Sequence, residues 1–296
     1  MTRSDKEVVA VVTGASRGAG KGIAEALGGT GATVYVTGRS RGGGDSPYGG
    51  SVRETAEGVT RAGGTGIPVV VDHADDAAVA ELFARVRSER GRLDILVNNA
   101  AAVAAPAPGG FWQRPLSTAD PLTVGLRSHY VAAWHAAPLL IAGGRGLIVN
   151  TGHYGAVSYH QGPAYGAQKA GADKMAADMA KELYPYGVAA LSIWMGSLDT
   201  ERVRAHLQSL ALAPEQRAAL PPRESPHFTG RVIAALYASD ELMAFSGRAI
   251  IGAELGAYLD VTDVDGSRPR SRRLALGGPP EPHPSLRPEA SSHVNR

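Results

Sequence analysis

The stretch that decides the fold is residues 147–170, LIVNTGHYGAVSYHQGPAYGAQKA. Its apolar start predicts a buried parallel strand, and residues 163–183 predict a long helix with proline in the first turn, where its missing N–H costs nothing. Tyr165 and Lys169 share one face of that helix because they stand at positions i and i+4. A nearby cation can lower the pKa of a tyrosine by roughly one to three units. Such a pair can exchange a proton with a substrate oxygen, although an ordinary amphipathic helix can carry the same two residues.

Composition predicts one α/β domain over residues 1–265 and a tail over 266–296. The chain has 296 residues, 44% hydrophobic and 20% charged, with a formal net charge of +2, so neither a nucleic acid nor a membrane is an expected partner. The chain has no cysteine, which excludes disulfides and zinc–thiolate sites and fits a cytoplasmic location. The first apolar run is too short for a signal peptide or a membrane span. The tail is rich in proline and arginine, and we expect it to be disordered.

The N-terminal stretch predicts a dinucleotide site. A β-branched run at 8–12 leads into a glycine-rich loop at 13–22 and then a helix-like segment. Glycines allow a tight turn and close approach of a pyrophosphate, and the N-terminus of the following helix offers free N–H groups to that anion. A glycine triplet alone is weak evidence in a chain with 38 glycines, but its place between strand and helix strengthens it. The candidate cofactor-binding residues of this loop are Gly14, Ser16, Arg17, Gly18 and Gly20.

The second predicted strand, 33–37, favours NADPH over NADH as the cofactor. It is followed by Arg39, at the place where NAD-preferring proteins usually carry an acid for the ribose hydroxyls. A guanidinium there can pair with a 2′-phosphate, and Arg17 can add a second contact. Two solvated surface arginines are the alternative.

The next two strand ends supply further candidates for cofactor binding. The strand over 67–71 is followed by Asp72, whose carboxylate can accept from an adenine amino group because Asp75 is available to cap the next helix. His73 is placed in the same group and predicts no metal site, since no second ligand stands at helical or turn spacing from it. The strand over 93–97 leads to Asn99 and Ala100, which we expect at the cofactor cleft.

The remaining elements complete an α/β sheet and suggest where substrate binds. A loop rich in proline, alanine and glycine over 102–121 is a candidate substrate wall, and the irregular segment before residue 226 is a candidate mobile lid. Tyr154 and Trp194 could stack on a flat substrate or simply pack, and Thr200 is a further cofactor candidate. The predicted helices lie at 52–62, 75–90, 121–141 and 227–238, and the predicted later strands at 188–194 and 249–251.

Three motifs agree in order and spacing with the short-chain dehydrogenase/reductase superfamily, which the chain resembles over roughly residues 8–265. They are TGxxxGxG at 13–20, NNA at 98–100 and YxxxK at 165–169. Within the superfamily the chain is most similar to the group typified by dehydrogenase/reductase member one, through VVTGASRG (11–18), GRLDILVNNA (91–100), VGLRSHY (124–130) and DVDG (263–266). The resemblance implies a Rossmann-like, doubly wound, seven-stranded parallel sheet in a single domain. It also implies use of NADPH, hydride transfer to or from a carbonyl or alcohol, and a homodimer or homotetramer paired through the helices around 126–141 and 164–183.

The resemblance also implies roles for the residues at the catalytic centre. Tyr165 corresponds to the general acid or base, and Lys169 to the lysine that binds the nicotinamide ribose and lowers the tyrosine pKa. The family's serine, twelve or thirteen residues before the tyrosine, falls here on His153 or Gly152. An asparagine that supports a proton relay in many members falls on Gly125, where a water could take over. An imidazole can replace the serine as an N–H donor, and more strongly when protonated, so His153 is our third catalytic candidate.

The sequence therefore predicts an NADPH-dependent reductase of a ketone, or an imine, on a small to medium organic substrate. Two alternatives remain open. The missing serine allows non-redox acid–base chemistry such as isomerisation, cyclisation or elimination on the same fold. A non-catalytic NADPH-binding regulator is the other alternative, and the presence of both Tyr165 and Lys169 argues against it.

Overall fold

The computed structural model describes residues 7–103, 108–213, 215–216 and 220–286. A seven-stranded sheet lies at its centre, with the order β3-β2-β1-β4-β5-β6-β7 and every neighbouring pair parallel. Its strands are β1 (Val9–Val12), β2 (Thr33–Gly38), β3 (Thr65–Val70), β4 (Ile95–Asn98), β5 (Gly146–Gly152), β6 (Val188–Trp194) and β7 (Ala249–Ile251). The predicted doubly wound sheet is confirmed. Its strand order reverses between β1 and β4, the kind of point at which such sheets bind ligands.

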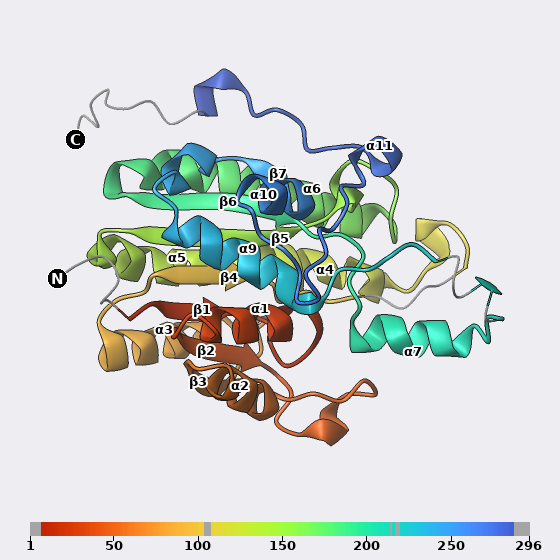
Figure 1. Cartoon of the computed structure of the whole chain (residues 1–296), viewed down its shortest axis with the longest axis horizontal. Coiled ribbons are helices and arrows are strands. Elements are labelled where there is room, and N and C mark those ends of the chain that lie inside the picture. Colours follow the sequence, from red (N-terminus) through yellow and green to blue (C-terminus); the bar gives the residue numbers. More distant parts are fainter. Residues whose placement is uncertain (1–6, 104–107, 214, 217–219, 287–296) are drawn as a thin grey trace.

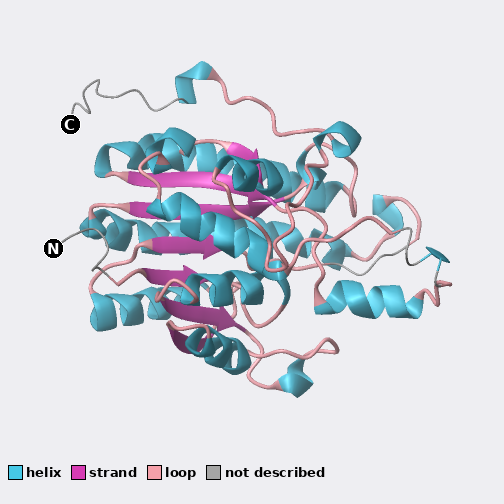
Figure 2. Ribbon diagram, in the orientation of Figure 1, coloured by secondary structure: helices cyan, strands magenta, loops and turns pink. Residues whose placement is uncertain are grey.

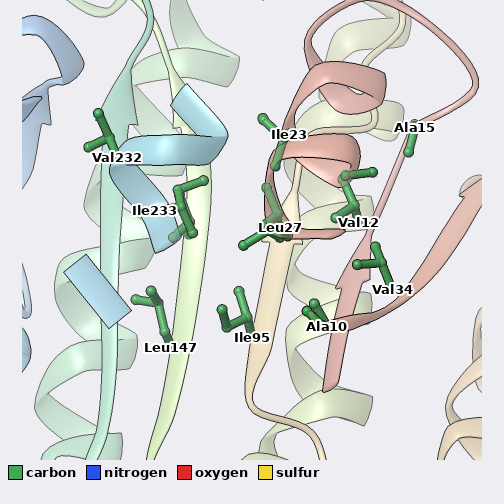
Figure 3. Close-up of a cluster of buried hydrophobic side chains, with 14 of the residues drawn as sticks. Ala10, Val12, Ala15, Ile23, Leu27, Val34, Ile95, Leu147, Val232 and Ile233 are labelled. Atoms are coloured by element: carbon green, nitrogen blue, oxygen red, sulfur yellow. The ribbon is translucent and has the colours of Figure 1, made fainter. Parts of the chain in front are cut away.

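Helices cover both faces of the sheet, as Figure 1 shows. The main ones are α1 (Gly18–Gly28), α2 (Val52–Arg61), α3 (Asp76–Arg90), α5 (Ser128–Gly143), α6 (Pro163–Leu183) and α9 (Pro226–Ala238). Side chains of α1, α2 and α9 form one buried cluster with the sheet, and those of α3, α5 and α6 form another on the opposite face. Figure 3 shows the first cluster, in which Ile23 and Leu27 of α1 and Val232 and Ile233 of α9 pack over the strands. Burial of each such side chain contributes about 1.5–3 kcal/mol.

All strands point the same way, so their carboxyl ends meet at one edge of the sheet. Figure 2 shows the arrowheads on the side where α7 (Glu201–Ser209) and α11 (Arg273–Leu276) also lie. The registers Val12↔Val97 and Gly152↔Trp194 bring neighbouring strand ends level with one another. The loops that follow these strands therefore have to meet.

The helix predicted over 121–141 is interrupted. The short helix α4 (Asp120–Leu122) ends before Gly125, which has a φ of +136°, and α5 begins only at Ser128. Glycine adopts such a φ at little cost, whereas other residues are strained there. Pro138 lies inside α5 without ending it.

The segment predicted as irregular before residue 226 contains the helix α7. Thr200 is its N-cap, with Oγ1 accepting from the N–H of Val203 at 3.4 Å. The prolines of this segment, residues 214, 221 and 222, all follow this helix in the sequence. Its role as a lid stays a prediction.

The C-terminal segment differs from the expected disordered tail over residues 266–286. Arg268 pairs with Asp260, and Arg273 makes a two-point ion pair with Glu254 at 2.6 and 2.8 Å. Leu276 packs beside a buried aromatic cluster. The arginines that made this stretch look unable to fold have charged partners on the domain, so the boundary expected at residue 265 is crossed by many contacts. Residues 287–296 lie outside the described part of the chain.

None of the helices in the described ranges has the length and apolar character needed to cross a membrane.

Candidate active site

The glycine-rich loop leaves no space for side chains where it meets β4. Gly14 has a φ of +63°, and a Cβ on it would lie 2.6 Å from the Cα of Ala100. A Cβ on Gly20 would lie 2.4 Å from the carbonyl oxygen of Gly14. Gly18, with a φ of +57°, opens the first turn of α1. The loop therefore needs glycine at all three positions that the sequence singled out.

An anionic side chain already lies against the first turn of α1. The N–H of Gly18 donates to the carboxylate of Glu201 at 2.9 Å, while the N-cap residue, Arg17, makes no capping bond with its own side chain. Thr200 lies beside the same turn, its Cγ2 3.6 Å from where a Cβ on Gly18 would be. N–H groups and the helix dipole favour negative charge at this point. The crowded glycines and the carboxylate at Gly18 together fit a cradle for a phosphate-bearing cofactor.

Asn99 holds this loop in place through the N–H₂ group of its side chain. Its side-chain N–H₂ donates to the carbonyls of Thr13 and Gly14, at 2.9 and 3.1 Å. The hydroxyl oxygen of Thr13 accepts from the backbone N–H groups of Asn99 and Ala100, both at 2.9 Å. These four bonds fix the end of β4 to the end of β1.

Positive charge gathers beside the end of β2. Arg17 donates to the Ser40 hydroxyl at 2.6 Å and to the carbonyl of Gly49 at 2.9 Å, and Arg39 is exposed. Burial lowers the pKa of Arg17, and repulsion from Arg202 and Arg39 adds to the effect while Glu201 opposes it. The structure thus brings the two predicted arginines together and adds a third. Ser16, another cofactor-binding candidate of the loop, is buried, with 7% of its surface exposed, whereas Arg39 is exposed.

At the end of β3, the two predicted residues have different surroundings. Asp72 is exposed, and its carboxylate accepts from the N–H of Ala74 at 3.0 Å; Asp75 caps α3, as expected. His73 is 4% exposed and its Nε2 lies 2.8 Å from the Thr37 hydroxyl. Burial lowers the pKa of His73 to about 4. A buried neutral imidazole bonded to β2 holds the strand ends together and leaves Asp72 as the residue that faces solvent.

The catalytic candidates meet just beyond the end of β5. The ring of His153 lies 5.8 Å from that of Tyr165 and 4.6 Å from that of His160, centroid to centroid. Lys169 is buried; its Nζ donates to the carbonyl of Thr151 at 2.8 Å and lies 5.7 Å from the centroid of the Tyr165 ring. The turn from β5 into α6 therefore brings an imidazole, a phenol and an amine together.

Burial governs the protonation of Tyr165 and Lys169. It raises the pKa of the Tyr165 phenol above its ordinary value and lowers that of the Lys169 amine to about 8. The pKa of Tyr165 is therefore shifted in the direction opposite to the lowering expected from Lys169, and burial of the phenol is the cause. Both groups carry their protons at neutral pH.

His153 is neutral and its tautomer follows from its contacts. Its Nδ1 accepts from the backbone N–H of Gly155 at 3.0 Å, so the proton of the neutral ring lies on Nε2. Burial lowers the pKa of His153 to about 3, helped by His160, Lys169 and Arg272. The imidazolium considered from the sequence is thus disfavoured, and what remains is an Nε2–H donor.

The helix break at Gly125 is tied to the catalytic helix. The carbonyl of Gly125 accepts from the Gln168 side chain at 2.8 Å, and its N–H donates to the Ser128 hydroxyl at 3.0 Å. A Cβ on Gly125 would lie 3.2 Å from the Gln168 side chain. Gln168 precedes Lys169 in the chain, so the break fixes the start of α6.

Comparison with known proteins assigns the chain to the family that its motifs resemble. The family model for short chain dehydrogenases matches residues 8–210. The chain is a short-chain dehydrogenase/reductase. It is 36% identical over 279 residues to dehydrogenase/reductase SDR family member 1 of Homo sapiens, covering 90% of this chain and 86% of the relative. It is 31% identical to 1-cyclohexenylcarbonyl-CoA reductase of Streptomyces collinus over 72% of each chain. The crystal structure of a short chain dehydrogenase from Mycobacterium thermoresistibile has the same fold, with a TM-score of 0.70, 23% identity, and coverage of 87% of this chain and 89% of that one.

Membership makes the protein an oxidoreductase of the dehydrogenase/reductase type and implies a nicotinamide dinucleotide cofactor. In this short-chain dehydrogenase/reductase the two predicted aromatic substrate residues are packed inside. Tyr154 is 1% and Trp194 0% exposed, and their rings lie 5.4 Å apart, edge to face. Trp194 donates to the Asp173 carboxylate at 2.9 Å. Of the two alternatives left open by the sequence, packing is the one that these contacts favour.

Sequence reasoning missed three residues that the fold of this dehydrogenase/reductase brings to the site. Glu201 and Arg202 come from a segment expected to be irregular, and Arg272 from a tail expected to be disordered. No local pattern marks them, because each reaches the site from an element far away in the sequence. Phe111 and Trp112 of the predicted substrate wall are 64% and 75% exposed, while residues 104–107 of that wall lie outside the described residues.

Proposed function

We propose that this protein is an NADPH-dependent reductase of a ketone, or an imine, on a small to medium organic substrate. The observation that carries the proposal is the meeting of His153, Tyr165 and Lys169 beyond the end of β5, at the same edge of the sheet as the glycine cradle. When bound, the reduced nicotinamide supplies a hydride to the substrate carbon. The names of the relatives, a dehydrogenase/reductase and a reductase, support this reaction type.

Each catalytic candidate then has a role that its surroundings support. Tyr165 keeps its proton at neutral pH and is the general acid that protonates the substrate oxygen as it gains charge. His153 takes the place of the family's serine and donates from Nε2–H to the same oxygen, as a neutral group that needs no change of protonation state. Lys169 carries a charge at neutral pH, binds the nicotinamide ribose, and is held by the carbonyl of Thr151.

The preference for NADPH rests on the arginine cluster beside β2. Arg17 and Arg39 interact electrostatically beside the end of β2 and are the proposed cations for a 2′-phosphate. Arg202, whose guanidinium carbon is 5.2 Å from the centroid of the Tyr48 ring, is a third cation near Arg17. Guanidinium groups bind phosphate oxygens at two points, which makes them selective for the phosphorylated cofactor.

The test is the absorbance of the reduced nicotinamide while purified protein meets NADPH, then NADH, with a panel of diketones, quinones, aldehydes and cyclic imines. We expect substrate-dependent loss of the NADPH signal that Tyr165→Phe abolishes and Tyr159→Phe leaves intact, since Tyr159 is exposed. Tight NADPH binding without consumption on any substrate would contradict the reductase proposal.

Tight NADPH binding without consumption would favour acid–base chemistry without net redox change. The cluster of His153, His160 and Tyr165 supports this alternative, because neutral imidazoles and a phenol within 6 Å of one another can pass a proton between them. Product formation with constant NADPH absorbance would identify it.

We also propose a homodimer or homotetramer in the cytoplasm. The outer side of α5 carries Tyr130 and Trp134, 54% and 64% exposed, which is unusual for large aromatic side chains on a helix. A contact between two copies of the chain that buries both side chains would explain why they are exposed in a single copy. Light scattering of wild type and Trp134→Glu would test it, the variant being expected to shift to a smaller assembly.

A further inference from the structure

A charged residue from the C-terminal segment lies beside the catalytic centre. The backbone N–H of Arg272 donates to the phenol oxygen of Tyr154 at 3.0 Å, and Tyr154 follows His153 in the chain. One guanidinium nitrogen of Arg272 donates to the hydroxyl of Ser197 at 2.7 Å. Ser197 follows β6 and His153 follows β5, two strands whose last residues pair. Arg272 is thus anchored beside the loops that follow β5 and β6 by both its backbone and its side chain.

Its neighbours in the segment hold it there. Arg273 is fixed by the two-point ion pair with Glu254, and Leu276 packs against the cluster that includes Tyr154 and Trp194. A Cβ on Gly277 would lie 3.1 Å from the side chain of Val157, in the turn between β5 and α6. The helix α11 is therefore pinned against the loop that carries His153.

The positive charge of Arg272 lacks a partner within the described ranges. Arg268 and Arg273 each pair with an acid, whereas no carboxylate of those ranges forms an ion pair with Arg272, which is half-buried. Its charge reaches the site, because it helps to lower the pKa of both His153 and His160. A partly desolvated guanidinium beside neutral imidazoles is costly unless an anion joins it.

We propose that Arg272 selects substrates that carry a carboxylate or comparable anionic group close to the reacting carbonyl. The proposal rests on the reductase function proposed above and names its substrate class. A carboxylate accepts two parallel N–H bonds from a guanidinium, and the bond to Ser197 uses only one of its nitrogens. The bond to the hydroxyl of Ser197 holds one end of the guanidinium and leaves its other N–H groups for that contact.

Binding of unreactive acids tests the proposal without relying on turnover. Calorimetric titration of the NADP⁺-loaded protein with benzoate, phenylacetate and 3-phenylpropanoate, each matched by its primary amide, covers a range of distances between ring and charge. We expect at least one acid to bind about ten- to a hundredfold more tightly than its amide, as expected for a charged hydrogen bond. Arg272→Gln should remove that difference, and Arg270→Gln, in the same segment but exposed, should keep it.

Three results would overturn the assignment. The first is equal binding of every acid and its amide by the wild type. The second is an equal loss of the preference for the acid in Arg272→Gln and Arg270→Gln. The third is weakened NADPH binding in Arg272→Gln with unchanged acid binding, which would make Arg272 a cofactor residue. If acids bind through Arg272 but the protein consumes no NADPH with any keto acid, the reductase function fails and the anion site stands. For keto acids that are reduced, the ratio of kcat/KM between acid and methyl ester should fall at least about tenfold in Arg272→Gln.

Discussion

Around β1 and β4 the chain comes together through backbone atoms that leave no room for side chains, whereas around β5 and β6 it comes together through charged and aromatic side chains. The first region, the cofactor cradle, is fixed by Gly14, Gly20 and the amide of Asn99. The second, the catalytic centre, depends on His153 and on a C-terminal segment more than a hundred residues further along the chain. Both regions join distant parts of the chain, the cradle through close packing of backbone and the catalytic centre through side-chain contacts.

This contrast indicates how the cofactor cradle and the catalytic centre each respond to amino-acid substitution. Close packing of the backbone decides the cradle, and at Gly14 and Gly20 it leaves no room for an added Cβ. In the catalytic centre, the identity of a side chain sets which proton or charge is present, and its replacement can leave the fold intact. The predictions below separate these two kinds of effect.

Among the variants that follow, the largest effect is expected for His153. His153→Ala removes a preorganised donor and should lower kcat about a hundred- to a thousandfold with little change in NADPH binding. His153→Ser, which restores a hydroxyl at this place, should recover part of the loss. Steady-state kinetics and cofactor titration would measure both. If Ala and wild type turn over equally, the proposed role of His153 is wrong.

In the cradle, Gly20→Ala should act on structure. The new Cβ would lie 2.4 Å from the Gly14 carbonyl and 2.5 Å from the Asn99 amide, so overpacking should cost about 1–3 kcal/mol of stability and weaken binding of both cofactors. Gly44→Ala is the matched control, since nothing lies within 4 Å of its added atom. Thermal unfolding and cofactor titration would show the difference, and equal behaviour of the two variants would contradict the close packing.

Arg39→Ala should separate the two cofactors. Loss of a charged contact to the 2′-phosphate should raise the Kd of NADPH about ten- to thirtyfold while that of NADH stays unchanged. Arg61→Ala, on the exposed end of α2, is the control. A parallel loss for NADPH and NADH would mean that Arg39 does not read the phosphate.

The catalytic centre should show one alkaline limb in its pH profile. Lys169 has its pKa lowered to about 8, so its charge, present below that pH, is lost as pH rises through 8, and kcat/KM should fall towards tenfold per unit above it. No limb is expected near the ordinary histidine pKa, because His153 stays neutral down to about 3. Rates between pH 5.5 and 9.5 at saturating NADPH test this, and a limb that remains in Lys169→Arg would have another origin.

Glu201→Gln is the smallest expected change. The amide oxygen can still accept from the Gly18 N–H, but the negative charge that competes with a phosphate is gone. NADPH should therefore bind about two- to fivefold more tightly, with the gain shrinking at high salt. Tighter binding that does not depend on salt would point to a change of shape instead of charge.

The sequence predicted the parts of this molecule that depend on local pattern. Apolar runs between turn signals located the strands, and the limits of β6 and β7 match the prediction. It failed where one residue outweighed the pattern around it: the φ of Gly125 divides a helix that looked continuous. The sequence also failed to predict ion pairs between distant residues. The arginine-rich composition of 266–286 suggests a disordered tail, but in the structure Arg268 pairs with Asp260 and Arg273 with Glu254. Burial likewise decides the pKa of Tyr165, and spacing to Lys169 could not reveal it.

The docked C-terminal segment has a consequence for the order in which the protein is made. All seven strands and the glycine loop precede residue 266, so a growing chain can complete its sheet before Arg272 and α11 have been synthesised. Domains fold as units during synthesis once their residues are available. A chain interrupted at residue 265 would then hold every element of the cradle and the Tyr165 helix, yet it would lack Arg272 and the contacts of the C-terminal segment with Tyr154 and Ser197.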